Sequence, residues 1–287
     1  MILTRKNSDF PNKLKQSKIS KLYYRGNIDL LKRKSIAIVG SRKMTNYGRE
    51  VARRFSDFLS KEGYAIISGL ALGVDSYAHI AALENDGRTI AVLPSGINQI
   101  YPKENNILAQ RIINNGGLII SEYEDEEEVS LKCFPKRNEL IARLSDCILI
   151  IEAGEKSGST ITGRKGFQLG IPVFCVPGRI DDKYSKGTNL LISQGANIIL
   201  EPKMIIDFLE AEETFEELNK TQIEFEKLND ESDGIYSLIS DKPINIDEIA
   251  KQSELSISAI IERLLILEIN GAIKKIPGEK YIRSNYE

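Results

Sequence analysis

The sequence predicts a doubly wound α/β domain with a mostly parallel sheet, followed by a small C-terminal winged helix. Three observations support this prediction. Short apolar runs alternate with segments of helical length and pattern, which is typical of parallel strands joined by helices. Small-residue turns follow several of these runs, at the strand ends where ligands bind in such folds. Near the C-terminus the pattern changes to clustered helices and two short β segments.

The first expected strand leads directly into a candidate anion-binding turn. Ile36–Val39 is a run of apolar residues without alternation, which predicts a strand buried on both faces. Gly40, Ser41 and Arg42 follow, and an amphipathic helix is expected from about Asn46 to Lys61. Free N–H groups and the helix dipole attract anions at such a turn, and the arginine adds positive charge. The turn indicates either a phosphate-bearing ligand or a simple strand–helix connection with a surface arginine. It matches neither the Gly-x-Gly-x-x-Gly fingerprint nor a P-loop.

The remaining strands of the α/β domain follow at similar intervals, and a helix is expected from about Val74 to Asn85. The strands are expected at Tyr64–Ser68, Thr89–Leu93, Leu118–Ser121, Cys147–Glu152, Val173–Val176 and Asn197–Leu200. The carboxyl ends of parallel strands meet at one edge of the sheet, so the loops after them should gather there. These loops are Gly40–Arg42, Ser68–Gly73, Pro94–Gly96 and Ala153–Thr160.

Beyond Pro202 the sequence predicts an acidic linker and then a winged helix. Helical segments are expected at Gly234–Ser240, Ile246–Lys251 and Ser256–Asn270, with Asn245 or Ile246 opening the second and Ser256 capping the third. Two β segments, Ala272–Ile276 and Lys280–Arg283, would be joined by a turn at Pro277 and Gly278. The expected organisation is a basic lead-in (1–34), an α/β domain (35–205), an acidic helical linker (206–231) and a winged helix (232–287).

Composition and charge exclude several classes of protein. The 287-residue chain is 41% hydrophobic, and no apolar run is long enough to span a bilayer. The N-terminus lacks the apolar stretch of a signal peptide, so a cytoplasmic protein is expected. Three scattered cysteines indicate neither a disulfide framework nor a zinc site. No metal or cofactor is expected.

The formal charge of −2 conceals an uneven distribution. Residues 1–43 contain twelve Lys or Arg against two Asp, whereas residues 207–231 contain ten acids against two lysines. Residues 122–128 contain six carboxylates. We interpret the two acidic runs as a solvated linker and loop rather than metal sites, because no histidine or spaced Asp-x-Asp pattern accompanies them.

Two further motifs have the residue types that bind nucleic acid. Phe134–Asn138, expected as a loop, offers an aromatic face, two cations and an amide, which proteins that bind single-stranded nucleic acid use for stacking, charge and hydrogen bonding. A buried Phe with a basic surface turn explains the same residues. Ser157–Thr160 precedes a helix and predicts a second phosphate cradle, although an ordinary serine cap explains it too. His79 is the only histidine and is interpreted as structural, and Asp75 as a helix cap.

The motifs together resemble the bacterial DNA-processing protein A (DprA/Smf) family across residues 35–200. The matching residues are Val39–Arg42, Ser68–Asp75 with Ala78 and His79, Ala91–Gly96 with Tyr101 and Pro102, Ser121 and Glu122, Phe134–Asn138, Ser157–Ser159 with Ile161 and Thr162, Val176–Gly178, Gly187–Asn189, and Gly195 and Ala196. The lead-in Leu22–Asn27 also matches the segment that precedes this core in the family.

The resemblance implies a Rossmann-like domain that binds single-stranded DNA and delivers it to the RecA recombinase in natural transformation and homologous recombination. It also implies a homodimer without catalytic turnover. By this resemblance Gly40, Ser41 and Arg42 would hold backbone phosphates and Phe134 would face a base. Lys132, Lys136, Arg137 and Asn138 would line the DNA groove, and Ser157, Gly158 and Ser159 would add N–H contacts.

The chain departs from the family at informative positions. The family usually has Phe-Pro-x-Arg-Asn-Arg, whereas Glu139 replaces the last arginine here, so it could weaken DNA affinity or pair with Arg137. Many members also carry a helical domain before the core, for which residues 1–34 are too few.

Two other functions remain open. The crevice could bind or hydrolyse a mononucleotide, although the Pro-Gly-Gly-x-Gly-Thr string of such enzymes is absent. The winged helix could regulate duplex DNA, but its expected recognition helix carries Glu262 and Glu268 against a single Arg263, which favours a protein contact or self-association.

Overall fold

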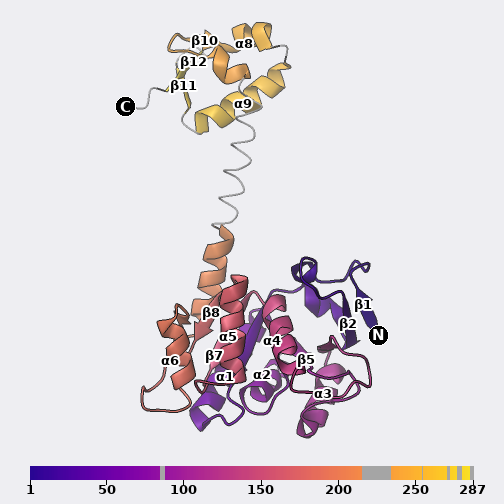
Figure 1. The fold of residues 1–287 in the computed structure, drawn as a ribbon. Coiled ribbons are helices and arrows are strands. Elements are labelled where there is room, and N and C mark those ends of the chain that lie inside the picture. The colour runs from indigo at the N-terminus through magenta and orange to yellow at the C-terminus, as the bar shows by residue number, and fades with distance from the viewer. Residues whose placement is uncertain (85–87, 215–233, 254, 270–271, 277–279, 285–287) are drawn as a thin grey trace. The chain divides into compact units, whose positions relative to one another are not determined.

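The computed structural model describes residues 1–84, 88–214, 234–253, 255–269, 272–276 and 280–284 (Figure 1). It divides into two units, Met1–Leu209 and Glu210–Glu287, and each is described by itself. The first contains a nine-stranded sheet in the order β1-β2-β6-β5-β4-β3-β7-β8-β9. Its strands are β1 (Ile2–Thr4), β2 (Lys21–Gly26), β3 (Ser35–Gly40), β4 (Ala65–Ser68), β5 (Thr89–Val92), β6 (Leu118–Ser121), β7 (Cys147–Ile151), β8 (Val173–Cys175) and β9 (Asn197–Ile198).

The sheet confirms the doubly wound, mostly parallel architecture. From β6 to β9 every neighbouring pair is parallel, and only β1 and β2 are added antiparallel at one end. The chain runs outward from β3 through β4, β5 and β6, and then returns to place β7 on the other side of β3. The strand order therefore reverses between β3 and β7, which is where such folds open a crevice for ligands.

Helices cover both faces of this sheet because its central strands bury side chains on both sides. Ile36 and Ile38 of β3 belong to the apolar cluster that includes side chains of α1 and α2, whereas Ala37 and Val39 belong to the cluster that includes α4. The helices are α1 (Asn46–Lys61), α2 (Val74–Leu83), α3 (Asn106–Asn114), α4 (Cys133–Leu144), α5 (Gly158–Leu169) and α6 (Lys186–Ser193). Short 3-10 helices are η1 (Asn12–Leu14), η2 (Ile28–Lys32) and η3 (Lys103–Asn105).

The expected strands of the first unit are present to within two residues at each end, but two segments differ from the prediction. The basic lead-in forms β1 and β2, which extend the sheet beyond β6. Phe134–Asn138, expected as a loop, lies in the first turns of α4. Pro135 is compatible with this helix, because a proline is tolerated in the first turn, where its missing N–H would have no partner anyway.

The second unit is a small winged helix around its own apolar cluster. It contains β10 (Ile244–Asn245), α8 (Ile246–Ser253), α9 (Ile257–Ile269), β11 (Ile273–Ile276) and β12 (Lys280–Arg283), with strand order β10-β12-β11. The predicted caps are confirmed, since Asn245 Oδ1 accepts from Glu248 N and Ser256 Oγ accepts from Ala259 N. Residues 203–214 are helical. The rest of the expected linker, 215–231, and the turn at Pro277 and Gly278 lie outside the described residues.

Candidate nucleic-acid interface

A cavity of about 600 Å³, which we call the strand-end cavity, opens where β3 and β7 end. The loops after these two strands contribute Gly40–Lys43 on one side and Gly154–Ser159 on the other. Nine of the eleven predicted site residues line it: Gly40, Ser41, Arg42, Phe134, Arg137, Asn138, Ser157, Gly158 and Ser159. The prediction that these loops gather at one edge of the sheet is therefore confirmed by their placement.

Arg42 provides one of the exposed positive charges of this cavity. It follows β3 on an exposed loop, and no carboxylate pairs with it among the described residues. Its guanidinium Cζ lies 5.4 Å from the ring centroid of Phe134, within cation–π distance. Gly73, whose φ of 82° favours glycine, lets the loop before α2 approach the backbone of Ser41 and Arg42 closely. A guanidinium held in this way remains available to a phosphate.

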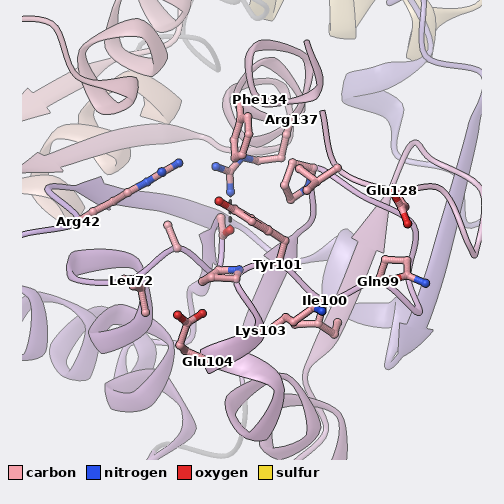
Figure 2. A pocket seen from close by; sticks show the side chains of 15 residues that line it. Arg42, Leu72, Gln99, Ile100, Tyr101, Lys103, Glu104, Glu128, Phe134 and Arg137 are labelled. Atoms are coloured by element: carbon pink, nitrogen blue, oxygen red, sulfur yellow. Dashed lines mark hydrogen bonds between the residues drawn. The ribbon is translucent and has the colours of Figure 1, made fainter. Parts of the chain in front are cut away.

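Phe134 stands between the strand-end cavity and a second one of about 850 Å³, which we call the aromatic cavity. Figure 2 shows Arg42, Tyr101, Phe134 and Arg137 pointing toward one another around this space. The rings of Tyr101 and Phe134 meet edge to face, with centroids 5.7 Å apart. The four residues line the aromatic cavity together with Lys103, Glu104 and Glu128, so it combines apolar faces with charges of both signs.

Arg137 lies at the floor of both cavities and is turned inward. Its side chain is 6% exposed, donates to the carbonyl oxygens of Gly69 and Val92, and donates to Asn138 Oδ1 at 2.9 Å. Asp75 faces it from α2, and burial raises the pKa of Asp75 while it lowers the pKa of Arg137. Asp75 does not cap its helix as expected, because its carboxylate accepts from the N–H groups of Gly69 and Ala71 instead.

The other cations of the predicted motif point elsewhere. Lys132 and Lys136 are exposed and line neither cavity. Glu139 does not pair with Arg137, as one interpretation of the sequence suggested. Its carboxylate lies 2.8 Å from Arg143 and 3.2 Å from Lys165, and these partners lower its pKa against the opposing effect of burial. The negative charge of Glu139 is therefore matched by two cations on its own side of α4 and α5.

Ser157 and Ser159 are used within the fold, as the simpler interpretation expected. The hydroxyl of Ser157 caps α5 by accepting from Thr160 N, and Ser159 Oγ donates to Gly40 O at 2.8 Å. Asn138 Nδ2 donates to Gly158 O at 3.3 Å, which joins α4 to the same turn. The helix N-terminus thus presents backbone N–H groups to the cavity, and its hydroxyls fix that turn against β3.

The structure adds cavity residues that sequence reasoning did not select. Lys43 and Lys183 line the strand-end cavity and extend its positive lining beyond Arg42. Tyr101 belongs to one of the family motifs, but no role was assigned to it from the sequence. Lys183 lies in a loop outside all of these motifs. Only the folded arrangement brings these side chains to the end of β3.

His79 is structural, as predicted. It is completely buried on α2, its Nδ1 lies 2.7 Å from Thr89 Oγ1, and it lines neither cavity.

Within the described residues, no helix is both long and apolar enough to cross a bilayer, and no cluster of His, Cys, Asp or Glu could hold a metal ion.

The described surface of the winged helix differs from that of a DNA-reading domain. Three large apolar side chains, Ile257, Ile261 and Leu265, are each at least half exposed and recur every four residues along α9. Glu262 lies beside them and is exposed. Exposed apolar residues on a helix of this kind suit a protein contact better than a phosphate backbone.

Comparisons with known proteins agree with this arrangement. The family model for DNA recombination-mediator protein A matches residues 1–210, and a model for the DprA winged helix domain matches residues 225–279. Protein Smf of Escherichia coli is 33% identical over 273 residues, an alignment covering 91% of this chain and 71% of that protein. DNA processing protein DprA of Streptococcus pneumoniae is 42% identical over 178 residues, covering 62% of each chain.

A solved structure of Helicobacter pylori DNA processing protein A, described with its single-stranded DNA binding mode, superposes with a TM-score of 0.66. It is 32% identical to this chain, and the superposition covers 74% of this chain and 97% of the other.

Proposed function

This chain belongs to the DNA recombination-mediator protein A family, and on that premise we propose that it binds single-stranded DNA at the strand-end cavity and delivers it to a RecA recombinase. The family relation supports a role in DNA uptake and homologous recombination. We also propose, from the same relation, that the protein acts as a homodimer in the cytoplasm.

The observation that carries the proposal is the pairing of unneutralised positive charge with an aromatic face at the strand ends. Arg42, Lys43 and Lys183 line the cavity with cations, and Phe134 exposes a ring beside them. Backbone N–H groups of the α5 N-terminus lie on the opposite side. Cations and amides can hold phosphates of any sequence while the ring stacks on a base, so the expected binding is sequence-independent.

A nucleotide-hydrolysing function is less well supported by the same geometry. Asp75 is the only carboxylate among the described residues that line the strand-end cavity, and it already accepts from two backbone N–H groups. A general base needs a carboxylate within reach of substrate and free to take a proton. We therefore expect no base release when the protein is incubated with AMP or other nucleoside monophosphates.

Regulation of duplex DNA through the winged helix is also less well supported, because exposed apolar residues and Glu262 occupy the described surface of α9. We propose a protein contact for this unit instead. The α9 surface would then serve assembly rather than sequence reading.

The test is a titration of the full chain with fluorescent single-stranded and duplex oligonucleotides at two salt concentrations. Single strands should bind more tightly, with little difference between oligo-dT and a mixed sequence. Affinity should fall as salt rises, because phosphate contacts release counterions. Tighter binding to duplex, or release of base from a mononucleotide, would reject the proposal.

A further inference from the structure

One residue, Glu152, binds both ends of the loop that carries Arg42. It immediately follows β7, and its backbone carbonyl accepts from Ser41 N at 2.7 Å. Its carboxylate accepts from Thr45 N at 2.8 Å through Oε2 and from Thr45 Oγ1 through Oε1. Because Arg42 lies between these two anchors, Glu152 helps to fix its backbone, together with the hydrogen bond of 3.2 Å from Val74 N to Ser41 O.

The surroundings of Glu152 are shaped around its carboxylate. The residue is 5% exposed, and an added Cβ at Gly48 would approach its Cδ to 2.5 Å. Thr45 caps α1 by accepting from Gly48 N at 3.1 Å, so the carboxylate also lies at a helix N-terminus, where negative charge is favourable. A glycine in the first turn of α1 thus makes room for a buried acid.

The backbone of Glu152 is also unusual. Its φ is 48°, in the left-handed region that residues with a side chain adopt at a cost. Glycine would adopt this conformation more easily, yet the position carries a glutamate. Such a residue in a sparsely populated conformation is expected where its side chain has a specific task.

We propose that Glu152 is a positioning residue that holds the Ser41–Thr45 loop so that Arg42 stands over Phe134, ready for a phosphate. This inference rests on the proposed function, because it assigns Glu152 a role in the same site. Glu152 lines neither cavity and both carboxylate oxygens have partners, so it acts through the loop and does not touch DNA. A loop held in its binding conformation lowers the entropy lost when DNA binds.

The test combines Glu152→Gly with Arg42→Ala in a double-mutant cycle, measuring oligo-dT affinity of the full chain. Glycine relieves the backbone strain and removes the carboxylate, so the variant should fold while its loop is released. We expect Glu152→Gly alone to weaken binding about tenfold. In the Arg42→Ala background the same change should have almost no further effect, because the residue that it positions is gone. Glu152→Gln keeps one acceptor oxygen for Thr45 N and should recover most of the affinity.

The cycle separates failure of this inference from failure of the proposed function. If Arg42→Ala weakens binding and Glu152→Gly weakens it equally in both backgrounds, Glu152 is merely structural and the inference is wrong. If Arg42→Ala has no effect, the proposed DNA site itself is wrong. Circular dichroism establishes that each variant is folded. Should Glu152→Gly be unfolded, Glu152→Asn replaces it, because asparagine tolerates a positive φ but is too short to reach both groups of Thr45. The same cycle with Arg42→Ala then decides between the outcomes.

Discussion

The guanidinium of Arg42 lies over the ring of Phe134, with 5.4 Å between Cζ and the ring centroid. Arg42 comes from the loop after β3 and Phe134 from the first turn of α4, so the contact joins two elements that are distant in sequence. In the proposed DNA site, this contact places the cation that would bind a phosphate next to the ring on which a base would stack. Charge and stacking can therefore be tested separately at two neighbouring side chains.

Replacing Arg42 with alanine should remove one phosphate contact. We expect weaker binding to oligo-dT at moderate salt and a slope of log K against log[salt] that is flatter by about 0.7. Lys136→Ala should change both quantities less, because Lys136 lines neither cavity. Arg53→Ala is a matched control, since Arg53 is an exposed arginine on α1 paired with Glu84. Equal losses for Arg42→Ala and Arg53→Ala would contradict the site.

Replacing Phe134 should affect stacking without changing the number of phosphate contacts. Base–aromatic stacking contributes about 1–3 kcal/mol per base, so Phe134→Ala should weaken binding by roughly 5- to 150-fold. The salt slope should stay close to that of the original protein, and Phe134→Trp should keep most of the affinity. Both quantities come from titrations at several salt concentrations. A flattened slope in Phe134→Ala would show that the ring mainly supports Arg42.

Sequence reasoning brought most residues of the strand-end cavity together because local sequence patterns show where the strands of a parallel sheet end. The apolar runs at Ile36–Val39 and Cys147–Glu152 predicted β3 and β7, and parallel pairing then required the loops after them to meet. Gly40–Arg42 and Ser157–Ser159 were placed correctly because each follows directly on such a strand or opens the next helix.

What the sequence did not predict depends on side-chain direction and long-range contact. Nothing in Phe134–Asn138 distinguishes Lys136, which is exposed, from Arg137, which turns inward to reach Gly69 O and Val92 O. They point to different sides because successive residues of a helix face different directions, and the segment was expected as a loop. Glu139 similarly pairs with Arg143 on α4 and Lys165 on α5 rather than with Arg137. Arg143 is four residues further along the same helix, and residues at this spacing are neighbours on the helix surface.

Replacing Asp75 with asparagine should destabilise the first unit. The change removes the carboxylate that faces the buried Arg137 and leaves that guanidinium without a compensating negative charge. Weakening the compensation of a buried charged group should lower the free energy of unfolding by about 1–3 kcal/mol. Guanidinium denaturation followed by circular dichroism should show a lower midpoint. Asp57→Asn, at a partly exposed ion pair with Lys61 on α1, is the control and should change stability by less than about 1 kcal/mol. A midpoint unchanged in Asp75→Asn would mean that Arg137 needs no such partner.

His79 should make the first unit less stable as pH falls below neutrality. Burial, together with the charge of Arg137, lowers the pKa of His79 from 6.5 to about 3. Thr89 Oγ1 donates to Ile66 O and so accepts from Nδ1, and Nε2 has no partner among the described residues. Between pH 6.5 and 3, His79 is therefore protonated in the unfolded state but neutral in the folded state. The free energy of unfolding decreases as the pH falls through this range. From pH 7.5 to pH 5 this loss should be about 2 kcal/mol. His79→Gln, which cannot titrate, should show a correspondingly smaller loss in denaturation curves at the two pH values. An equal loss in both proteins would place the pH dependence on the carboxylates and not on His79.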